Sequence, residues 1–278
     1  MPNPNVGWLY YVDYFRQDNS LKSMNLNFLL SNNYEEKKEA GKYLAKKCKR
    51  ISDLKLNEYS SAIDALNLPN LTDEDCFTLT TTYPGLLVGA GYEHELHLES
   101  EFKLGFFFDY TSGLPVIPGS SVKGVLRSAF KTKELIKELL SDKNEREVEE
   151  LELEIFEGVD IPETNKTSVD AYKQKKNWKY LPSPKKDVFY DAVIFGSNNK
   201  GQEFLAADFI TPHKDQFANP IPLQFMKVFP EVKFLFQFDV KNSKIAGMTR
   251  EGKRKLFEKI IQNLGIGAKT RTGYGWMQ

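Results

Sequence analysis

The 278-residue chain contains only two cysteines and three histidines. The cysteines, Cys48 and Cys76, do not form a Cys-x-x-Cys pair, which argues against a structural zinc site and a disulfide scaffold. No stretch approaches the roughly 18 apolar residues of a membrane span, and residues 1–5 lack the basic and apolar regions of a secretory signal. We therefore expect a cytoplasmic protein with reduced thiols, no membrane partner, no cofactor and no metal site.

Positive and negative charges cancel over the whole chain, but they are unevenly distributed along it. Residues 241–278 carry nine Lys or Arg against two acids, whereas residues 134–163 carry twelve acids against three basic residues. A nucleic-acid backbone is attracted to positive charge and repelled by negative charge. The C-terminal block therefore predicts a surface for polyanions, and the acidic block predicts a region that a nucleic acid avoids.

Hydrophobic periodicity predicts an alternation of strands and helices. The expected strands are 76–82, 102–109, 114–118, 188–195, 204–210, 233–240 and 274–277. The expected helices are 33–51, a helix capped by Ser120 or Ser121 that runs to about residue 130, and 249–264. Strands followed by a helix occur in each half, which predicts an α+β fold of two ferredoxin-like (RRM-like) units with antiparallel sheets, an architecture that often binds RNA.

Composition divides the chain into four expected regions. Residues 1–75 are predicted to be a helical N-terminal segment that packs on the core, and residues 76–130 the first ferredoxin-like half. Residues 131–187 combine an acidic helical stretch with a proline-, threonine- and lysine-containing arm, which indicates a charged insertion. Residues 188–278 are the second half and end in a glycine-rich loop.

This loop contains two Gly-x-Gly pairs that flank five residues with two cations. Glycine permits positive φ angles and close approach to backbone N–H groups, while the cations supply charge for phosphate. The loop lacks the Gly-Lys-Thr of a P-loop and the third glycine of a dinucleotide fingerprint, which disfavours ATP and NAD. A hairpin tip without a ligand is the alternative. The predicted RNA-binding residues are Gly265, Gly267, Lys269, Thr270, Arg271, Gly273, Tyr274 and Gly275.

A second predicted site for the RNA backbone lies at the start of the helix that follows residue 118. Gly119, Ser120 and Ser121 are expected to expose N–H groups at the helix N-terminus, where the dipole adds partial positive charge. Lys123 and Arg127 are four residues apart and share one helical face. A surface stripe of ion pairs is the alternative for these two cations.

These two motifs in this order, residues 113–127 and then Gly-x-Gly-x5-Gly-x-Gly, resemble the RAMP superfamily of CRISPR RNA-binding proteins. Residues 80–89, 91–95 and 107–115 look most like the sixth-subunit family of the type III-B Cmr effector complex, and the resemblance extends over about 77–278. It implies a non-catalytic backbone subunit for antiviral defence. Such a subunit holds the CRISPR guide RNA near its 3′ portion for target RNA recognition, beside other Cmr subunits of the RAMP type and a small helical subunit.

Two other functions are weighed against this one. An endoribonuclease needs a histidine general base or a loop aspartate. His94 and His97 lie on opposite faces of an expected strand and His213 lies in a loop, so we expect all three to be structural. Asp109 and Asp208 are the carboxylates best placed at strand ends, and a metal-assisted nuclease would need them to meet. The other alternative is a purely structural protein whose acidic insertion docks a neighbouring subunit.

Overall fold

The computed structural model describes residues 4–16, 33–66, 71–89, 94, 98, 100–161, 179–211 and 222–278. The helices are α1 (Val6–Tyr11), α3 (Tyr34–Ser52), α4 (Ser60–Ala65), α5 (Gly119–Ala129), α6 (Lys133–Leu139), α7 (Glu145–Glu152) and α9 (Arg250–Leu264). The strands are β1 (Cys76–Thr80), β2 (Val116–Ile117), β3 (Val188–Phe189), β4 (Ala192–Ser197), β5 (Leu205–Ile210), β6 (Leu223–Val228) and β7 (Val232–Asp239). Shorter helical turns include η2 (Leu56–Tyr59), η3 (Leu153–Glu157) and η5 (Thr270–Thr272).

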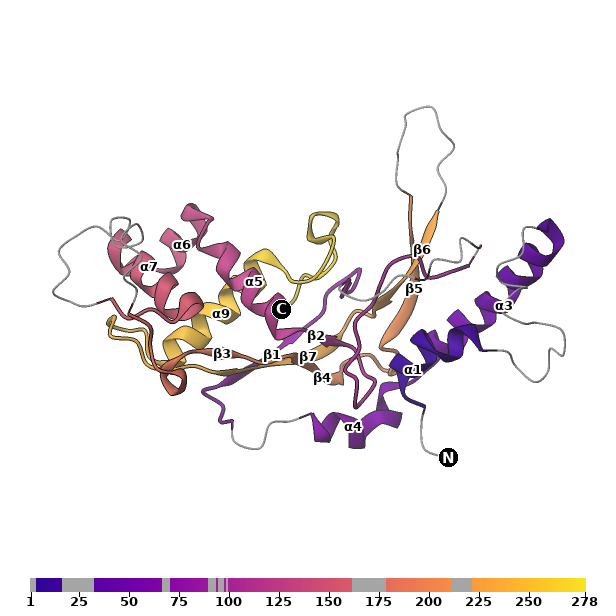
Figure 1. The fold of residues 1–278 in the computed structure, drawn as a ribbon, viewed down its shortest axis with the longest axis horizontal. Helices are drawn as coiled ribbons and strands as arrows, with labels where there is room; N and C mark the ends of the chain where they lie inside the picture. The colour runs from indigo at the N-terminus through magenta and orange to yellow at the C-terminus, as the bar shows by residue number, and fades with distance from the viewer. Residues whose placement is uncertain are drawn as a thin grey trace, which may run out of the picture.

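The main sheet is antiparallel, with the strand order β1-β7-β4-β2 and β3 paired with the end of β7. Helices α5 and α9 cover one face of this sheet, whereas α4 lies on the other side (Figure 1). Alternate residues of β7, Phe234, Phe236 and Phe238, are fully buried, as expected for a strand with one covered face. Phe238 packs against Phe257 of α9 with ring centroids 5.3 Å apart.

The connection of these elements matches one ferredoxin-like unit. In chain order it runs β1, α5, β4, β7 and α9, and the chain then returns to the free edge of β1 through a single bridge between Thr81 and Met277. The strands of this unit come from both predicted halves of the chain. An antiparallel α+β fold is therefore confirmed, while the duplication into two ferredoxin-like units and the four-region division stay predictions.

Strands β5 and β6 form a separate antiparallel hairpin that stands away from the main sheet, beside α1 and α3 (Figure 1). The sequence predicted β5 but missed β6, which follows a proline-rich passage. The expected strand at 102–109 was wrong: Lys103, Phe107 and Asp109 donate their N–H groups to three different segments, at 2.8, 3.1 and 2.8 Å. Without one continuous partner strand, this segment stays irregular, although Phe102, Phe106 and Phe108 are buried.

Two of the expected helix starts are confirmed and one was wrong. Asn33 caps α3, and the hydroxyl of Thr249 accepts from the first turn of α9. Neither serine caps α5, because that helix already begins at Gly119. The N–H of Gly119 donates to Oδ1 of Asp191 at 2.7 Å, so a carboxylate from the strand connection satisfies the first turn and replaces a serine cap.

The described parts of the N-terminal region and of residues 131–161 share the main hydrophobic core. Leu9 and Leu44 lie in the same buried cluster as Ile136, Leu151 and Phe156. The acidic segment is therefore amphipathic: its apolar side packs in the core beside α5, while its carboxylates are exposed or half-buried. Residues 162–178 of the expected arm and residues 212–221 of the proline-rich passage lie outside the described residues. None of the helices in the described ranges is long and apolar enough to cross a membrane.

Candidate nucleic-acid interface

A groove of about 460 Å³ separates α5 from the glycine-rich loop at 265–275. Helix α5 contributes Ser121, Gly124, Val125 and Ser128, the loop contributes Gly267 and Ala268, and Val88, Gly89 and Ile117 complete the lining. These residues come from three segments that are far apart in the sequence. The structure thus brings the α5 motif, the glycine-rich loop and the end of the 80–89 segment to one place.

The loop needs glycine for its own packing. Gly267 and Gly275 have φ angles of +91° and +75°. A Cβ atom on Gly267 would lie 2.3 Å from the carbonyl oxygen of Leu87, and one on Gly275 would lie 1.9 Å from that of Ile266. Both positions therefore require glycine whether or not a ligand is bound.

The tip of the loop presents three adjacent backbone donors. Lower in the loop, Ala268 and Gly275 donate their N–H groups to carbonyls of the segment after β1, at 2.9 and 2.8 Å. The N–H groups of Lys269, Thr270 and Arg271 have no acceptor among the described residues. Lys269 has a left-handed backbone and the next three residues form η5, a succession that turns neighbouring N–H groups to the same side.

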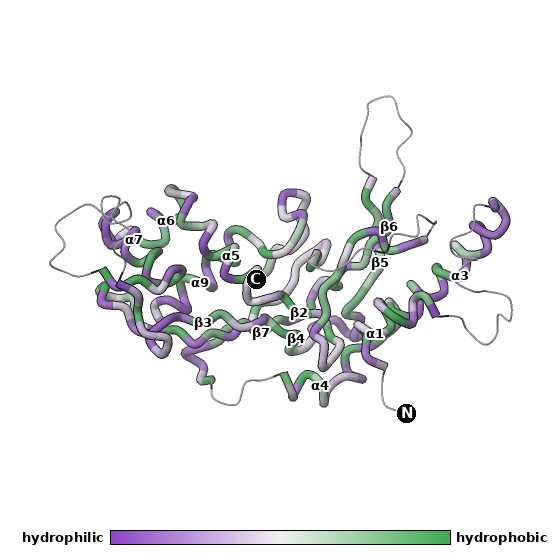
Figure 2. The backbone as a smooth tube through the Cα atoms, in the orientation of Figure 1, coloured by the Kyte–Doolittle hydropathy of each residue, from purple (hydrophilic) through white to green (hydrophobic). Residues whose placement is uncertain are grey.

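Lys269 and Arg271 add two positive charges to this tip. Arg271 is exposed and Lys269 is half-buried, and neither forms an ion pair within the described part of the chain. Figure 2 shows hydrophilic residues at the end of the loop that follows α9. An anion that reaches the tip therefore meets cations that no carboxylate has neutralised.

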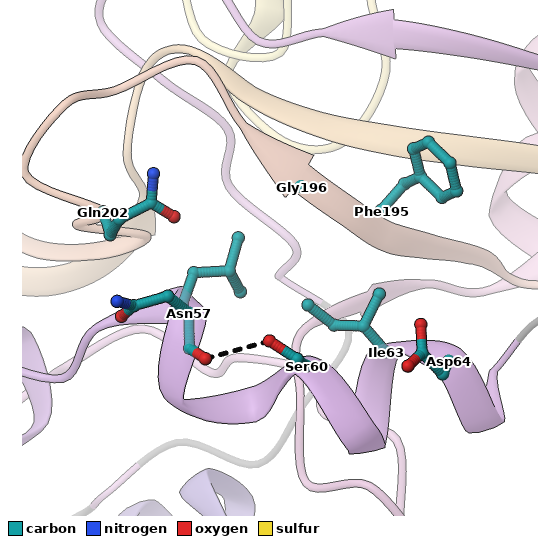
Figure 3. Close-up of a pocket in the computed structure, with 8 residues that line it drawn as sticks. Asn57, Ser60, Ile63, Asp64, Phe195, Gly196 and Gln202 are labelled. Atoms are coloured by element: carbon teal, nitrogen blue, oxygen red, sulfur yellow. Dashed lines mark hydrogen bonds between the residues drawn. The ribbon is translucent and has the colours of Figure 1, made fainter.

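Two further hollows lie elsewhere on the molecule and are less suited to phosphate. One, of about 330 Å³, is lined in part by Asp109 and Asp191. The other, of about 250 Å³, lies between α4 and β4, where Asp64 and Asn57 face Phe195 and Gln202 (Figure 3). Both linings include a carboxylate, which repels a phosphate, whereas the lining of the groove beside the glycine-rich loop includes none. The groove beside the basic tip is the best candidate interface.

Of the five residues predicted on α5, only Ser121 lines the groove. Ser121, Val125 and Ser128 are spaced i, i+4, i+7, so they share one side of the helix. Lys123 and Arg127 lie on the opposite flank of α5: the ammonium of Lys123 stands 5.7 Å from the centroid of a phenylalanine ring on β3, and Arg127 pairs with a glutamate of η3. The ion-paired arrangement, which the sequence left open, is thus present at Arg127. That i, i+4, i+7 spacing was the sequence signal for the groove face, and we missed it.

Tyr274 takes part in a polar cluster below the loop. Its hydroxyl donates to Oδ2 of Asp208 at 2.8 Å, and the ammonium of Lys227 donates to the same oxygen at 2.6 Å. Burial raises the pKa of Tyr274, and the bond to Asp208 raises it further. Although burial acts in the opposite direction, the hydrogen bonds from Lys227 and Tyr274 lower the pKa of Asp208. The cluster holds the loop on the β5–β6 hairpin.

The carboxylates considered for catalysis have structural partners. Asp208 lies in the middle of β5, so its expected position at a strand end was wrong. Asp109 accepts four hydrogen bonds, from the N–H and hydroxyl groups of Thr111 and Ser112, at 2.6–3.0 Å. These bonds hold the turn that leads into β2. No hydrogen bond or shared partner links Asp109 to Asp208 in the described structure.

The histidines show no catalytic arrangement in the parts of the chain that the structure describes. His94 is buried among Tyr10, Tyr14 and Phe15, with ring centroids 4.2–4.9 Å away. Burial lowers the pKa of His94 to about 4, so this side chain is neutral at physiological pH. The other two, His97 and His213, lie outside the described residues. Within the described ranges, no group of three or more His, Cys, Asp or Glu could hold a metal ion.

Comparison with known proteins gives matches over most of the chain. The family model of the RAMP superfamily matches residues 78–278. The CRISPR system Cmr subunit Cmr6 of Pyrococcus furiosus is 25% identical over 239 residues, which cover 70% of this chain and 65% of that protein. The chain thus matches slightly less than two thirds of this relative's length.

Two solved structures are also similar. A cryo-EM structure of the type III-B Cmr-beta bound to cognate target RNA superimposes with a TM-score of 0.53 at 20% identity, covering 99% of this chain and 90% of that chain. The crystal structure of Cmr6 from Pyrococcus furiosus gives a TM-score of 0.37 at 20% identity, over 73% of this chain and 96% of that chain. The first superposition supports the mixed helical and antiparallel fold along nearly the whole chain.

Proposed function

The chain belongs to the RAMP superfamily, and on that premise we propose that it is a non-catalytic, RNA-binding subunit of a type III-B CRISPR ribonucleoprotein. In this role it holds the guide RNA near its 3′ portion while the target RNA pairs with it. Its partners are the guide and target RNAs, other Cmr subunits of the RAMP type and a small helical subunit. The similarity to Cmr6 and to a target-bound Cmr-beta structure supports this assignment.

The observation that carries the proposal is the basic tip of the glycine-rich loop beside a groove free of carboxylates. The unused N–H groups of residues 269–271 can donate to phosphate oxygens, and Lys269 and Arg271 add charge-assisted bonds. These contacts read no base, so they suit a subunit that must hold guide RNAs of different sequence. Across the groove, Ser121 can donate a further hydrogen bond from its hydroxyl, whereas the hydroxyl of Ser128 already donates to the carbonyl of Val125 at 2.7 Å and can only accept.

We propose that catalysis belongs to other subunits of the complex. The four hydrogen bonds at Asp109 and the pairing of Asp208 with Lys227 support this proposal, because both carboxylates are already held in structural roles. The test is to incubate the protein with labelled guide and target RNA, with and without divalent metal. Cleavage that is lost in Asp109→Ala, Asp208→Ala or His213→Ala while binding persists would establish the endoribonuclease alternative instead.

A second ferredoxin-like unit also remains a proposal. The β5–β6 hairpin, bridged to the segment after β1 through Leu86 and Val228, would form its sheet, and α3 packs against β5. The boundaries at residues 75, 130 and 187 belong to the same proposal. Limited proteolysis followed by mass spectrometry would locate the boundaries. If cleavage occurred inside β4 or β7 earlier in the time course than at residues 75, 130 and 187, the proposed boundaries would be contradicted.

The proposed RNA site is tested with the double variant Lys269→Ala, Arg271→Ala. We expect weaker binding to single-stranded RNAs of any sequence, and a salt dependence of the logarithm of affinity that is flatter by roughly 1 to 2 units. The matched control is Lys255→Ala, Lys259→Ala, which removes the same charge from the exposed side of α9, with Lys255 about 15 Å along the helix from the loop. The site is refuted if the folded loop variant has the salt slope of wild type. It is also refuted if the control variant loses as much RNA affinity as the loop variant.

A further inference from the structure

Two exposed aromatic side chains flank the basic tip of the glycine-rich loop. Tyr83 is 85% exposed and Trp276 is 39% exposed. Their segments run side by side, since the N–H of Thr82 donates to the carbonyl of Trp276 at 3.0 Å and that of Gly275 donates to Gly85 at 2.8 Å. A single exposed aromatic ring is ordinary on a protein surface, but here two occur on adjacent segments next to cations that form no ion pair among the described residues.

The indole of Trp276 is fixed to the tip itself. Its Nε1–H donates to the carbonyl oxygen of Thr270 at 3.1 Å. Thr270 stands between Lys269 and Arg271, so this bond ties the edge of the indole to the turn that carries both cations. The bond is made at the edge of the indole, so it orients the ring without using its faces. The next residue, Met277, is buried, which shows that the chain directs Trp276 outward while its neighbour packs in the core.

We propose that Trp276 and Tyr83 form a stacking platform for unpaired bases of the RNA strand whose phosphates bind at the loop tip. Single-stranded nucleic acids are held by cations that follow the backbone together with aromatic rings that stack on the bases. Both components are present here within one pair of adjoining segments. The inference rests on the proposed RNA site. It adds that the aromatic rings contact the bases of the strand, while the loop tip contacts its phosphates.

Charge decides between RNA and a protein partner for this surface. An apolar protein contact would bury Lys269 and Arg271 without a counter-ion, at a desolvation cost of several kcal/mol per charge. An RNA strand supplies the phosphates that neutralise both cations and the flat π-faces that cover the rings. A bound RNA strand therefore provides partners both for the two cations and for the two aromatic rings.

The experiment compares two ligands, a uridine decamer and a decamer of the same ribose-phosphate backbone without bases. Binding of the full-length protein is measured by fluorescence anisotropy for wild type, Trp276→Ala, Trp276→Phe, Tyr83→Ala and Tyr110→Ala. Tyr110, which is 97% exposed on the turn held by Asp109, is the matched control for a surface tyrosine. Trp276→Phe keeps an aromatic ring but loses the bond to the loop.

We expect Trp276→Ala to weaken binding of the uridine decamer by about 5- to 150-fold. Tyr83→Ala should also weaken this binding. Trp276→Phe and Tyr110→Ala should bind the uridine decamer with an affinity near that of wild type. Binding of the base-free decamer should not change in any variant. Equal losses on both ligands, or Trp276→Phe as weak as Trp276→Ala, would show that Trp276 only braces the loop and would overturn the stacking platform. Wild-type binding of the uridine decamer by Trp276→Ala would also overturn it. If wild type binds neither decamer, the proposed RNA site itself fails.

Discussion

Replacement of Lys253 by methionine should destabilise the protein strongly, because this lysine is the centre of a buried ionic cluster. Lys253 on α9 is 1% exposed. Its ammonium donates to Glu154 of η3 at 2.9 Å and to Asp187, just before β3, at 2.7 Å. The cluster joins the acidic segment to α9, the helix that leads into the glycine-rich loop. Its loss therefore tests how much these ion pairs contribute to holding the acidic segment on α9.

The magnitude follows from the burial of the partners. Lys253→Met removes the ammonium that these two carboxylates share and keeps an apolar stem of similar length, so the main change is electrostatic. Breaking a buried pair by removing one partner costs about 3–5 kcal/mol. For a chain of 278 residues, such a loss corresponds to a melting temperature lower by roughly 5–9 °C.

The loss should also depend on pH. Burial raises the pKa of Asp187 above its ordinary value, while Lys253 acts to lower it. A carboxyl group whose pKa is higher in the folded chain contributes stability that is present below its unfolded pKa and lost as pH rises through its folded pKa. Removal of Lys253 raises that pKa further, so the variant should be least stable near neutral pH and regain part of its stability on mild acidification.

Thermal and urea denaturation of the whole protein, at neutral pH and at about pH 5, measure both effects. Lys255→Met is the control, because Lys255 lies on the same helix but forms an exposed pair with Glu251 and should leave the transition unchanged. The reasoning fails if Lys253→Met has the melting temperature of wild type at neutral pH. It also fails if acidification destabilises the variant more than it destabilises wild type.

Three further predictions concern the groove, the loop and the polar cluster below it. Gly124→Ala should stabilise the protein by about 0.5–1 kcal/mol, since a Cβ there has nothing within 4 Å, yet it should weaken RNA binding in the same anisotropy assay; unchanged affinity would mean that RNA does not enter the groove at α5. Gly275→Ala, whose Cβ would lie 1.9 Å from the carbonyl of Ile266, should lower both the melting temperature and RNA affinity, and a wild-type result would contradict the loop packing. Tyr274→Phe, which loses the bond to Asp208, should cost about 1 kcal/mol of stability and leave RNA affinity unchanged; weaker binding at an unchanged salt slope would mean that the phenol contacts RNA.

Local patterns in the sequence predicted local structure well. The helices at 34–52 and 250–264 follow from residues three and four apart and from capping residues next to them, so no distant contact is needed to recognise them. The glycines and cations of the loop were likewise visible, and the motifs indicated the RAMP superfamily, which the family model bears out. The irregular path of residues 102–109 was not visible, because alternation reports burial and not which strand is the partner.

The side chains available to the candidate site could be read from the sequence: a glycine-rich loop with two cations, and a small-residue helix that follows Pro118. Which of them face the groove depends on the folded chain. Arg127 pairs with a residue 30 positions away and Tyr274 with one 66 positions away, so both leave the candidate surface, whereas Trp276 remains on it. Such choices depend on which distant charges and hydroxyls the fold brings within hydrogen-bond range, and spacing along the chain carries no information about that.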